Sequence, residues 1–577
     1  MAVYYITTSG SNGNSGVNEA NAKAIGFLSS LVAGDTAWVK AGNYGEQIIV
    51  INNSGTSDSN RIEILGYKNT IGDIQTSSIP DNIIRTVTNG GITAQPKTSN
   101  TFDLSYPIDV QTAESPTFIE NRAANDVGEG IAFRINSDYV TLKNFQFKYF
   151  ERSVYLDGNY TILDNITSVE CGAHDPSVSN PFLQYAGKGV TIYNDNHKIS
   201  NIVVSDAGAE GIVWVESLNG ESDNCVVVVG KNAHNATDYL YMLTKGVQNS
   251  THRNTTVMNF DWVDRSNHGI LCKADPNVQN DSPTNSPVAD TTLHCRDNTF
   301  DGFTIINHNL ELQFPEALEN TFKNGLLIAA PDFWTDSGVT SYGRQDWFAR
   351  MGLLLQNGSN NMFFQNLILV DQGITYNAWD EIIYDGTAQL ISAQNNEYDN
   401  LLFINTQGSY PVFDIRRFGA ENLGGVEGTG NRPQDYNWSA DHHTFYNCTF
   451  YNYGDILIPR RKSSDFNFIN CLFDDIPDET QFITDARTYD FDYTNSNMVN
   501  GFNDGGSTTS LQPIYENEGS YDLRQAAGSP LKGISVANTY RAAGGDVGWM
   551  QIGSVVLPVV DGLLSRKKSN LITYINS

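Results

Sequence analysis

One asparagine position recurs along this chain and constrains its fold more than any other feature. Each copy follows a polar or variable residue and precedes alternating small and apolar residues. The copies are Asn144, Asn165, Asn201, Asn224, Asn254, Asn298, Asn320, Asn366, Asn400, Asn447 and Asn470. The shortest gaps are 21, 22 and 23 residues, and gaps of 30 to 47 residues have the length of the same unit with an insertion. Such a period, with strand-like flanks, predicts a β-solenoid.

Stacked coils would place equivalent asparagines in a ladder, with each side-chain amide bonded to the next coil about 4.8 Å away. Six cysteines are scattered along the chain without a CxxC pair or a Cys/His metal spacing. Cys225, Cys448 and Cys471 directly follow ladder asparagines, where a small buried side chain is expected. We therefore interpret the cysteines as core residues rather than as a disulfide scaffold.

The composition indicates a β-rich, turn-rich protein, with 50 glycines, 11% aromatic residues and only 17% charged residues. A net charge of −30 argues against non-specific binding to nucleic acid or to an anionic membrane. No apolar run reaches the roughly 18 residues that span a bilayer, so we expect no membrane insertion. Residues 2–7 have the pattern of a strand rather than of a signal peptide. We expect an extracellular protein, either secreted after removal of a leader or carried on a virion surface.

Three segments are expected. Residues 1–127 would form an N-terminal cap and first coils with an insertion, 128–510 the main parallel β-helix, and 511–577 a closing or capping segment. A helix is predicted over residues 18–31, where it would cover the open end of the first coil. Long loop insertions are expected at 68–128, 274–292 and 329–350.

Pairs of apolar residues mark the inward positions of one short strand in each coil, and alternation makes the residues between them point outward. The pairs are Ile131/Phe133, Val154/Leu156, Val190/Ile192, Ile212/Trp214, Leu240/Met242, Ile270/Cys272, Leu310/Leu312 and Leu353/Leu355. Outward positions of neighbouring coils stack in columns. One such column contains Arg152, Lys188, Glu210 and Asp238, followed by His268.

This alignment brings three neighbouring coils together at a candidate site. Its members are Asp238, Tyr239, Tyr241, His268, Lys273, Glu311 and Gln313. We predict that Lys273, His268, Tyr241, Asp238 and Glu311 are catalytic and that Tyr239 and Gln313 bind substrate. The alternative is that these are ordinary polar residues on the outside of a solenoid.

A second candidate consists of two basic clusters one coil apart, which stand out in so acidic a chain. They contain Arg416 and Arg417, and Arg460 and Arg461. Guanidinium groups bind sulfate and carboxylate groups well, so these arginines are predicted to bind substrate. Neutralisation of nearby aspartates is an equally open interpretation.

Several segments together resemble right-handed parallel β-helix proteins that act on polysaccharides. They are the "AGDTAWVKAGNY" segment at 33–44, the strand pair at 48–68, the asparagine ladder and the closing segment at 526–549. The likeness is to the alginate lyase/chondroitinase B type and the pectate lyases, and also to phage tailspike depolymerases. It implies an all-β, right-handed parallel β-helix with an N-terminal capping helix and long loop insertions, a polysaccharide substrate and, for a tailspike, a homotrimer.

Two reactions remain open on this scaffold. β-Elimination needs a base, here Lys273 or His268, an acid, Tyr241 or Tyr239, and a neutraliser of the uronate carboxylate, either an arginine or Ca²⁺. Hydrolysis needs two carboxylates, about 5 Å apart for retention or about 6.5–9.5 Å apart for inversion. Asp238 with Glu311 or with Glu210 would supply such a pair.

Histidines are scarce, and one of them shares a strand with a lysine, which favours elimination. The predicted function is therefore extracellular depolymerisation of a uronate-containing or sulfated polysaccharide by β-elimination. A hydrolase and a non-catalytic glycan-binding adhesin or tail fibre are the alternatives.

Overall fold

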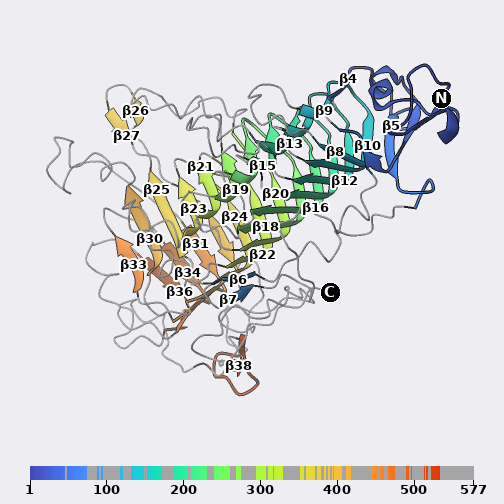
Figure 1. Ribbon diagram of the computed structural model, residues 1–577. Helices are drawn as coiled ribbons and strands as arrows, with labels where there is room; N and C mark the ends of the chain where they lie inside the picture. Colours follow the sequence, from blue (N-terminus) through green and yellow to red (C-terminus); the bar gives the residue numbers. More distant parts are fainter. Residues whose placement is uncertain are drawn as a thin grey trace, which may run out of the picture. The chain divides into compact units, whose positions relative to one another are not determined.

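Parallel β-coils build both compact units of the chain in the computed structural model (Figure 1). Unit 1 comprises Met1–Thr86 and Thr98–Leu271, and unit 2 comprises Val87–Lys97 and Cys272–Ser577. The structure describes residues 1–45, 48–73, 87–89, 92–94, 117–120, 131–148, 150, 152–169, 171, 187–205, 207, 210–229, 239–259, 268–273, 294–306, 310–315, 317–328, 351–356, 359–370, 373–378, 382–384, 387–389, 393, 395–405, 411–417, 443–452, 455–459, 466–474, 489–492, 495–496, 513, 515–517 and 522–532.

The coils of unit 1 contribute strands to two rows, row A and row B. Row A contains β1 (Val3–Ile6), β2 (Thr36–Lys40), β5 (Ile62–Tyr67), β10 (Val140–Lys148), β12 (Ile162–Val169), β14 (Lys198–Ser205), β16 (Glu221–Val229) and β18 (Thr251–Asn259). The short β8 (Thr117–Glu120) also pairs with β10, and β3 (Gly42–Asn43) pairs with β8. Row B contains β4 (Ile49–Ile51), β9 (Ile131–Ile135), β11 (Arg152–Leu156), β13 (Lys188–Tyr193), β15 (Glu210–Val215) and β17 (Tyr239–Thr244). The pairings along both rows are parallel.

Unit 2 repeats this plan. Row A contains β20 (Thr299–Ile306), β22 (Thr321–Ile328), β24 (Phe363–Val370), β28 (Glu397–Asp399), β29 (Leu402–Ile404), β31 (His443–Tyr446), β32 (Thr449–Tyr451), β34 (Phe466–Ile469), β35 (Leu472–Asp474), β36 (Tyr489–Asp492) and β37 (Asn495–Ser496). Row B contains β21 (Leu310–Pro315), β23 (Met351–Gln356), β25 (Gly373–Ala378), β30 (Pro411–Arg417) and β33 (Asp455–Pro459). The boundary between the units falls inside β19 (His268–Lys273).

The described part of the chain also contains three short antiparallel hairpins. They are β6 (Val87–Asn89) with β7 (Ile92–Ala94), β26 (Ile382–Tyr384) with β27 (Thr387–Gln389), and β38 (Tyr515–Asn517) with β39 (Asp522–Gln525). The described part of the predicted closing segment also packs Leu531 against Leu472 of β35. The predicted fold class, an all-β right-handed parallel β-helix, is confirmed. The predicted segment boundaries at 127 and 510 stay predictions.

The asparagine ladder is confirmed as a row of bends in the row A strands. Its residues have left-handed backbone angles, with φ of 65° at Asn144, 55° at Asn165 and 56° at Asn224. Asparagine tolerates this region better than other residues with a side chain beyond Cα. The side-chain amide of Asn165 donates to Asn144 Oδ1 at 3.0 Å, and that of Asn224 donates to Asn201 Oδ1 at 2.9 Å. Unit 2 continues the pattern, for example from Asn400 to Asn366 at 2.8 Å.

The prediction that Asn298 and Asn320 belong to the asparagine ladder is wrong. The ladder positions of their coils are Gly302, with φ of 75°, and Asn324, with φ of 57°. Asn298 and Asn320 are instead buried at an earlier corner, where Asn298 Nδ2 donates to Asn320 Oδ1 at 3.0 Å. The earlier corner also contains left-handed residues, five positions before the ladder, as in Asn219 and Asn224 or Asn361 and Asn366. Because asparagine suits both corners, the sequence pattern does not distinguish them.

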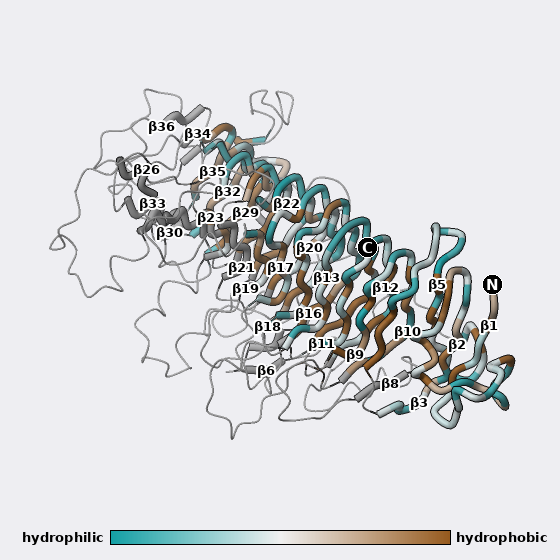
Figure 2. Tube along the Cα trace, turned by 90° about the horizontal axis from the view of Figure 1, so that it is seen from above, coloured by the Kyte–Doolittle hydropathy of each residue, from teal (hydrophilic) through white to brown (hydrophobic). Residues whose placement is uncertain are grey.

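Aromatic side chains stack through the interior of unit 2 with the same period. The ring sequence is Phe300, Phe322, Phe364, Tyr398, Phe445 and Phe468, with successive centroids 4.9, 5.8, 5.2, 4.2 and 5.1 Å apart. Hydrophobic residues accordingly follow the strands of the coils in Figure 2. These contacts repeat the spacing of the strands, so each coil buries the apolar face of its neighbour.

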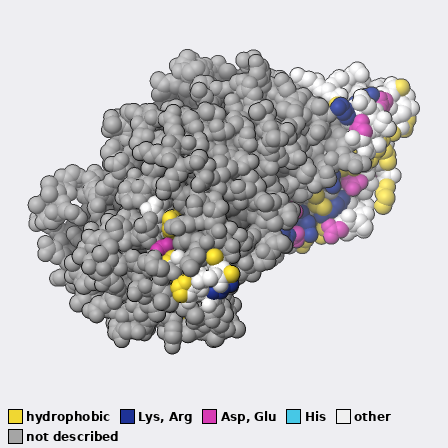
Figure 3. All heavy atoms as spheres, turned by 90° about the horizontal axis from the view of Figure 1, so that it is seen from below, with side chains coloured by type: hydrophobic (Ala, Val, Ile, Leu, Met, Phe, Trp, Pro, Cys, Tyr) yellow, Lys and Arg dark blue, Asp and Glu magenta, His cyan; other side chains and the backbone are white. Residues whose placement is uncertain are grey.

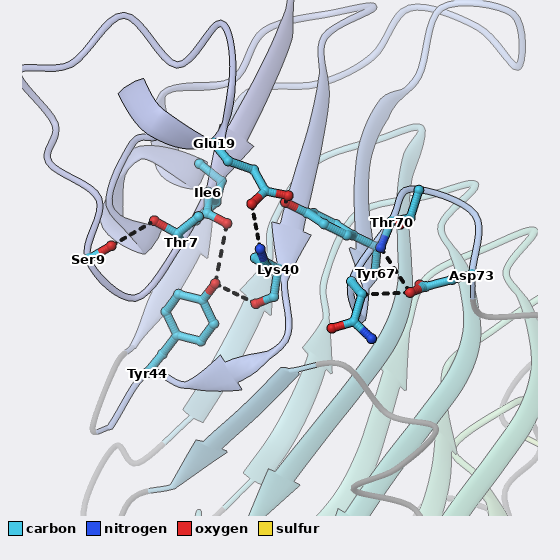
Figure 4. Close-up of polar contacts among 10 residues, drawn as sticks. Ile6, Thr7, Ser9, Glu19, Lys40, Tyr44, Tyr67, Thr70 and Asp73 are labelled. Carbon is cyan, nitrogen blue, oxygen red and sulfur yellow. Dashed lines mark hydrogen bonds and ion pairs between the residues drawn. The ribbon is translucent and has the colours of Figure 1, made fainter.

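The helical stretch predicted over 18–31 forms two short 3₁₀ helices, Glu19–Asn21 and Ile25–Ser30, and its capping role stays a prediction. The buried residues Ile25, Leu28 and Leu31 are three positions apart, which matches three residues per turn. Glu19 ties this segment to the first strands (Figure 4). Its carboxylate pairs with Lys40 and accepts a hydrogen bond from the Tyr67 hydroxyl at 2.9 Å. The Lys40 hydrogen bond lowers the pKa of Glu19.

A buried polar network lies inside unit 1. Trp214 Nε1 donates to the Tyr241 hydroxyl at 3.0 Å, and this hydroxyl donates to Ser222 Oγ at 2.9 Å. His252 Nδ1 lies 2.9 Å from both hydroxyl oxygens. Burial lowers the pKa of His252 to about 3. The imidazole is therefore neutral inside the coils, and the network joins four side chains of four strands.

The first prediction concerns the ladder. Replacing Asn224 by alanine removes its amide bond to Asn201 and leaves a residue that disfavours φ of 56°. We expect the free energy of unfolding to fall by about 2–3 kcal/mol, measured by urea denaturation. Asn224→Gly keeps the backbone angle accessible and loses only the amide, so it should lose about 1 kcal/mol. Equal losses in the two variants would contradict this account of the corner.

The second prediction concerns acid stability. The His252 imidazole has a pKa near 6.5 when unfolded and about 3 when folded, so the unfolded chain binds more protons between these values. Stability should therefore fall as the pH drops below about 6.5, by about 3 kcal/mol between pH 7 and pH 4 for this residue.

His252→Gln should reduce the difference between unfolding free energies measured at pH 7 and pH 4, whatever its effect on stability at pH 7. The matched variant is His197→Gln, because burial lowers the pKa of His197 to about 4 and its share should be lost over pH 6.5 to 4. An unchanged pH dependence in His252→Gln would show that this imidazole is not buried in neutral form.

Candidate functional site

The outer face of row B in unit 1 has aligned basic, acidic and aromatic side chains. One column runs Arg152, Lys188, Glu210 and Tyr239 across β11, β13, β15 and β17. The next column runs Arg134, Tyr155, Thr191, Val213 and Met242 from β9 to β17. We define the Arg–Tyr cluster as Arg134, Arg152, Tyr155, Asp157, Lys188, Tyr193, Glu210 and Tyr239. All eight residues are partly exposed.

Tyr155 lies at the centre of the Arg–Tyr cluster. The guanidinium carbons of Arg134 and Arg152 are 5.2 and 5.6 Å from its ring centroid, within the range of cation–π contacts. The Tyr193 ring lies 5.3 Å away at an angle of 37°. Two cations and two aromatic rings are thus held together by residues of β9, β11 and β13.

Ion pairs border these rings. Arg134 Nη2 lies 3.4 Å from Asp157 Oδ2, and Lys188 pairs with Glu210. The cluster therefore contains three cations and two carboxylates, although the whole chain carries a net charge of −30. On the face drawn in Figure 3, Lys and Arg side chains likewise lie beside acidic and apolar ones among the described residues. Glu216 also acts electrostatically on Tyr193, so charges of both signs meet on this face, and a contact with an anionic ligand would depend on the arginine side chains rather than on a net positive charge.

Burial raises the pKa of both Tyr155 and Tyr193. Nearby arginines oppose this shift at both rings without reversing it. Both phenols therefore remain protonated near neutral pH and can donate, but not accept, a proton in a reaction.

An apolar patch adjoins the Arg–Tyr cluster on the same face. It consists of Val213, Val215, Met242 and Leu271, all buried, with Tyr193 and Tyr239 packed against them. Outward positions of a solenoid are usually polar. The coils that contain β15 and β17 differ from this rule, because several of their outward positions are apolar. The patch gives the charged cluster one apolar edge.

The predicted site residues have different outcomes. Tyr239 lies on the outer face as predicted. It pairs with Glu210, and so occupies the column position that the alignment of the coils had given to Asp238. The predicted outward position of Tyr241 is wrong, because Tyr241 is fully buried and pairs with the inward residue Ile212. The inward pair of β17 is thus Tyr241/Leu243 and not Leu240/Met242. Five apolar or aromatic residues follow one another in this strand, so alternation alone leaves the register open.

Lys273 is 9% exposed, so the prediction that it stands on an open face is wrong. Its carbonyl oxygen accepts a bond from the Cys295 thiol at 3.0 Å. The backbones of further predicted residues are described, but their side chains lie outside the described part of the chain. These are His268 in β19, Glu311 and Gln313 in β21, and Arg416 and Arg417 in β30. Asp238, Arg460 and Arg461 lie wholly outside the described residues. All these roles stay predictions.

The sequence placed Arg152 and Lys188 in an outward column but did not indicate that they form a site with Arg134 and Tyr155. The signal that could have found them is the recurrence of basic and aromatic residues at one strand position in consecutive coils. The catalytic site was predicted in the later coils instead, because His268 and Lys273 share one strand there.

No cluster of three or more His, Cys, Asp or Glu side chains in the described part of the chain has the arrangement of a metal site. The Arg–Tyr cluster also does not fit calcium, since both of its carboxylates are ion-paired with cations. The predicted Ca²⁺ stays a prediction. Among the described residues, no helix has the length and hydrophobicity to cross a bilayer.

Comparison with solved structures gives likenesses at low sequence identity. A pectate lyase, Pel9A, is 10% identical, with 95% of this chain and 96% of that chain covered and a TM-score of 0.33. A mannuronic acid specific polysaccharide family 6 lyase from human gut microbiota is 10% identical over 77% and 87% of the two chains, with a TM-score of 0.35.

A GH87 alpha-1,3-glucanase catalytic domain is also 10% identical, over 82% of this chain and 63% of that chain, with a TM-score of 0.36. No protein-family model matches the chain, and no curated protein matches it in sequence. The parallel pairing of its own strands shows that the chain is a parallel β-helix protein.

The third prediction separates the two tyrosines of β17. Tyr241→Phe removes a hydroxyl bonded to Trp214 and Ser222 in the interior, so we expect a loss of about 1–3 kcal/mol in unfolding free energy. Tyr239→Phe removes a hydroxyl on the outer face and should change stability by less than about 0.5 kcal/mol. Urea denaturation of both variants measures this difference, and a larger loss in Tyr239→Phe would contradict the register of β17.

Proposed function

We propose that the chain binds an acidic polysaccharide on the Arg–Tyr cluster and cleaves its glycosidic bonds by β-elimination. The observation that carries the proposal is the arrangement of Arg134 and Arg152 around Tyr155, with Tyr193 beside it. Planar guanidinium groups pair with carboxylate or sulfate groups, and aromatic faces pack on the apolar faces of sugars. The same outward face therefore offers both kinds of contact that an anionic sugar needs.

In this proposal, the arginines neutralise the substrate carboxylate, which makes the adjacent C–H proton easier to remove. A phenol held protonated by burial, Tyr155 or Tyr193, gives its proton to the leaving glycosidic oxygen. His268, the candidate base from the sequence, lies in β19, four strands from Tyr155 along row B, or about 19 Å. It is therefore too far away to take a proton from a sugar held by Arg134 and Arg152, and the base of this proposal is not among the described side chains of the Arg–Tyr cluster. The reaction would take place outside the cell or on a virion surface, where such polysaccharides are found.

Hydrolysis is less well supported by the cluster. It requires one protonated carboxyl group at the glycosidic oxygen and a second carboxylate as base or nucleophile. Asp157 and Glu210 are each paired with a cation in the structure. Binding without cleavage is the second candidate function, because the described part of this face supplies cations and aromatic rings without a separate general base.

The fourth prediction tests activity and ligand class together. The protein is incubated with alginate, pectate, a glycosaminoglycan, a sulfated algal polysaccharide and a neutral glucan. New ultraviolet absorbance from an unsaturated sugar together with new reducing ends shows elimination, and reducing ends without that absorbance show hydrolysis. Binding without either product supports the adhesin function, and no binding to any anionic polymer refutes the use of this face.

Variants then locate the activity. Arg152→Gln should weaken binding of the anionic polymer by about 10- to 100-fold, since one charge-assisted contact is lost. Lys198→Gln is the matched control, because Lys198 is an exposed cation on row A that pairs with Glu221 at 3.1 Å. It removes the same charge from the chain and should change binding less than twofold. Tyr155→Phe should lower the cleavage rate more than the affinity. Equal losses of affinity in Arg152→Gln and Lys198→Gln would show that binding depends on the net charge of the chain and not on the Arg–Tyr cluster.

A further inference from the structure

Two cysteines of unit 2 occupy the same position in consecutive coils. Cys448 precedes β32 and Cys471 precedes β35, and these strands pair in register, with Thr449 opposite Leu472. The backbone N–H of Leu472 donates to the carbonyl oxygen of Cys448 at 2.8 Å, which places the two cysteines directly side by side. Adjacent parallel strands lie about 4.7–4.9 Å apart, and disulfides join Cα atoms about 4.4–6.8 Å apart.

Both cysteines follow a bend of the asparagine ladder, which fixes the direction of their side chains. Asn447 and Asn470 have φ of 56° and 55°, and Asn470 Nδ2 donates to Asn447 Oδ1 at 3.4 Å. Both thiols are free and fully buried. The corner thus holds the two coils in one register before any covalent bond forms.

The thiols also interact with each other. Burial, followed by a hydrogen bond with the Cys471 thiol, raises the pKa of Cys448. The thiols also donate to carbonyl oxygens. Cys448 donates to Tyr446 at 3.3 Å and Tyr398 at 3.7 Å, and Cys471 donates to Phe445 at 3.4 Å and Ile469 at 3.6 Å. The thiol–thiol and thiol–carbonyl contacts are enough to explain the positions of the two side chains.

We propose that Cys448 and Cys471 form a disulfide that joins two consecutive coils when the chain folds in the presence of a small-molecule disulfide. In this exchange the S–S bond of the oxidant breaks, one S–S bond forms between the two cysteine sulfurs, and the oxidant leaves as two thiols that carry the two cysteine protons. Because the folded thiols are buried, the exchange takes place while this coil is open. The bond closes a loop between residues 23 positions apart, as the preceding asparagines are.

Other cysteines provide the internal comparison. Cys272 and Cys295 are also near neighbours in unit 2, since the charge of Cys295 contributes to the raised pKa of Cys272. However, Cys272 belongs to row B strand β19, whereas Cys295 lies at a corner before row A strand β20, so they are not register partners. Cys225 follows ladder residue Asn224 in unit 1 and has no equivalent cysteine in its neighbouring coils, where Ile202 and Thr255 stand opposite it.

The fifth prediction is a count of thiols in the unsubstituted full chain. The protein is opened in urea, returned to native buffer with reduced and oxidised glutathione, and alkylated after denaturation. Mass spectrometry should find four alkylated cysteines of the six and a peptide cross-link between Cys448 and Cys471. Six alkylated cysteines, or a cross-link between Cys272 and Cys295 instead, would overturn the proposal. This count does not require any variant to fold.

Variants and stability give a second measurement. Cys225→Ala should keep the cross-link, whereas Cys448→Ala and Cys471→Ala should each lose it. The cross-linked form should unfold with an equilibrium constant about 300-fold lower than that of the reduced form, as expected for a loop of this length. An equal urea midpoint for the two forms would contradict a bond that fits the native register.

Discussion

Parallel hydrogen bonding between successive coils is the constraint on which the rest of the structure depends. A strand can pair with the next coil only if every coil bends at the same place, and the bend requires a left-handed residue. Asn144, Asn165 and Asn224 meet this requirement and add an amide bond between coils. In other coils the amide donates to the aspartate that precedes the bend. Asn201, Asn254 and Asn447 donate to Asp164, Asp223 and Asp399 at 2.8 Å, and Asn324 donates to Asp301 at 2.7 Å. Backbone geometry and side-chain bonding thus support the same register.

This register also makes a surface out of residues that are far apart in sequence. Arg134, Tyr155 and Tyr193 come from three coils, yet Arg134 and Tyr193 both contact Tyr155 because β9 and β13 each pair with β11. A rigid sheet holds such side chains with little conformational freedom, which reduces the cost of binding an extended ligand. The proposed polysaccharide-binding face is therefore a consequence of stacking rather than of any single loop.

The interior follows the same rule with polar as well as apolar groups. Trp214, Tyr241 and His252 form a network whose bonds depend on one register of β17. A shift of one residue would turn Tyr241 outward and leave buried polar groups unpaired, which costs more than exchanging one apolar residue for another. In row A, the parallel register of β32 and β35 has a similar effect, because it places the thiols of Cys448 and Cys471 side by side.

The sequence by itself determined the coil, because a repeated corner residue and alternating apolar positions leave few other folds. It also identified the outward columns with Arg152, Lys188 and Glu210. It did not separate the two asparagine corners, which use the same residue type, as Asn298 and Asn320 show. Nor did it assign the register of β17, where consecutive apolar residues fit either face. Those choices depend on hydrogen bonds between residues of different coils, such as Tyr241 to Ser222, and such bonds exist only once the coils are stacked.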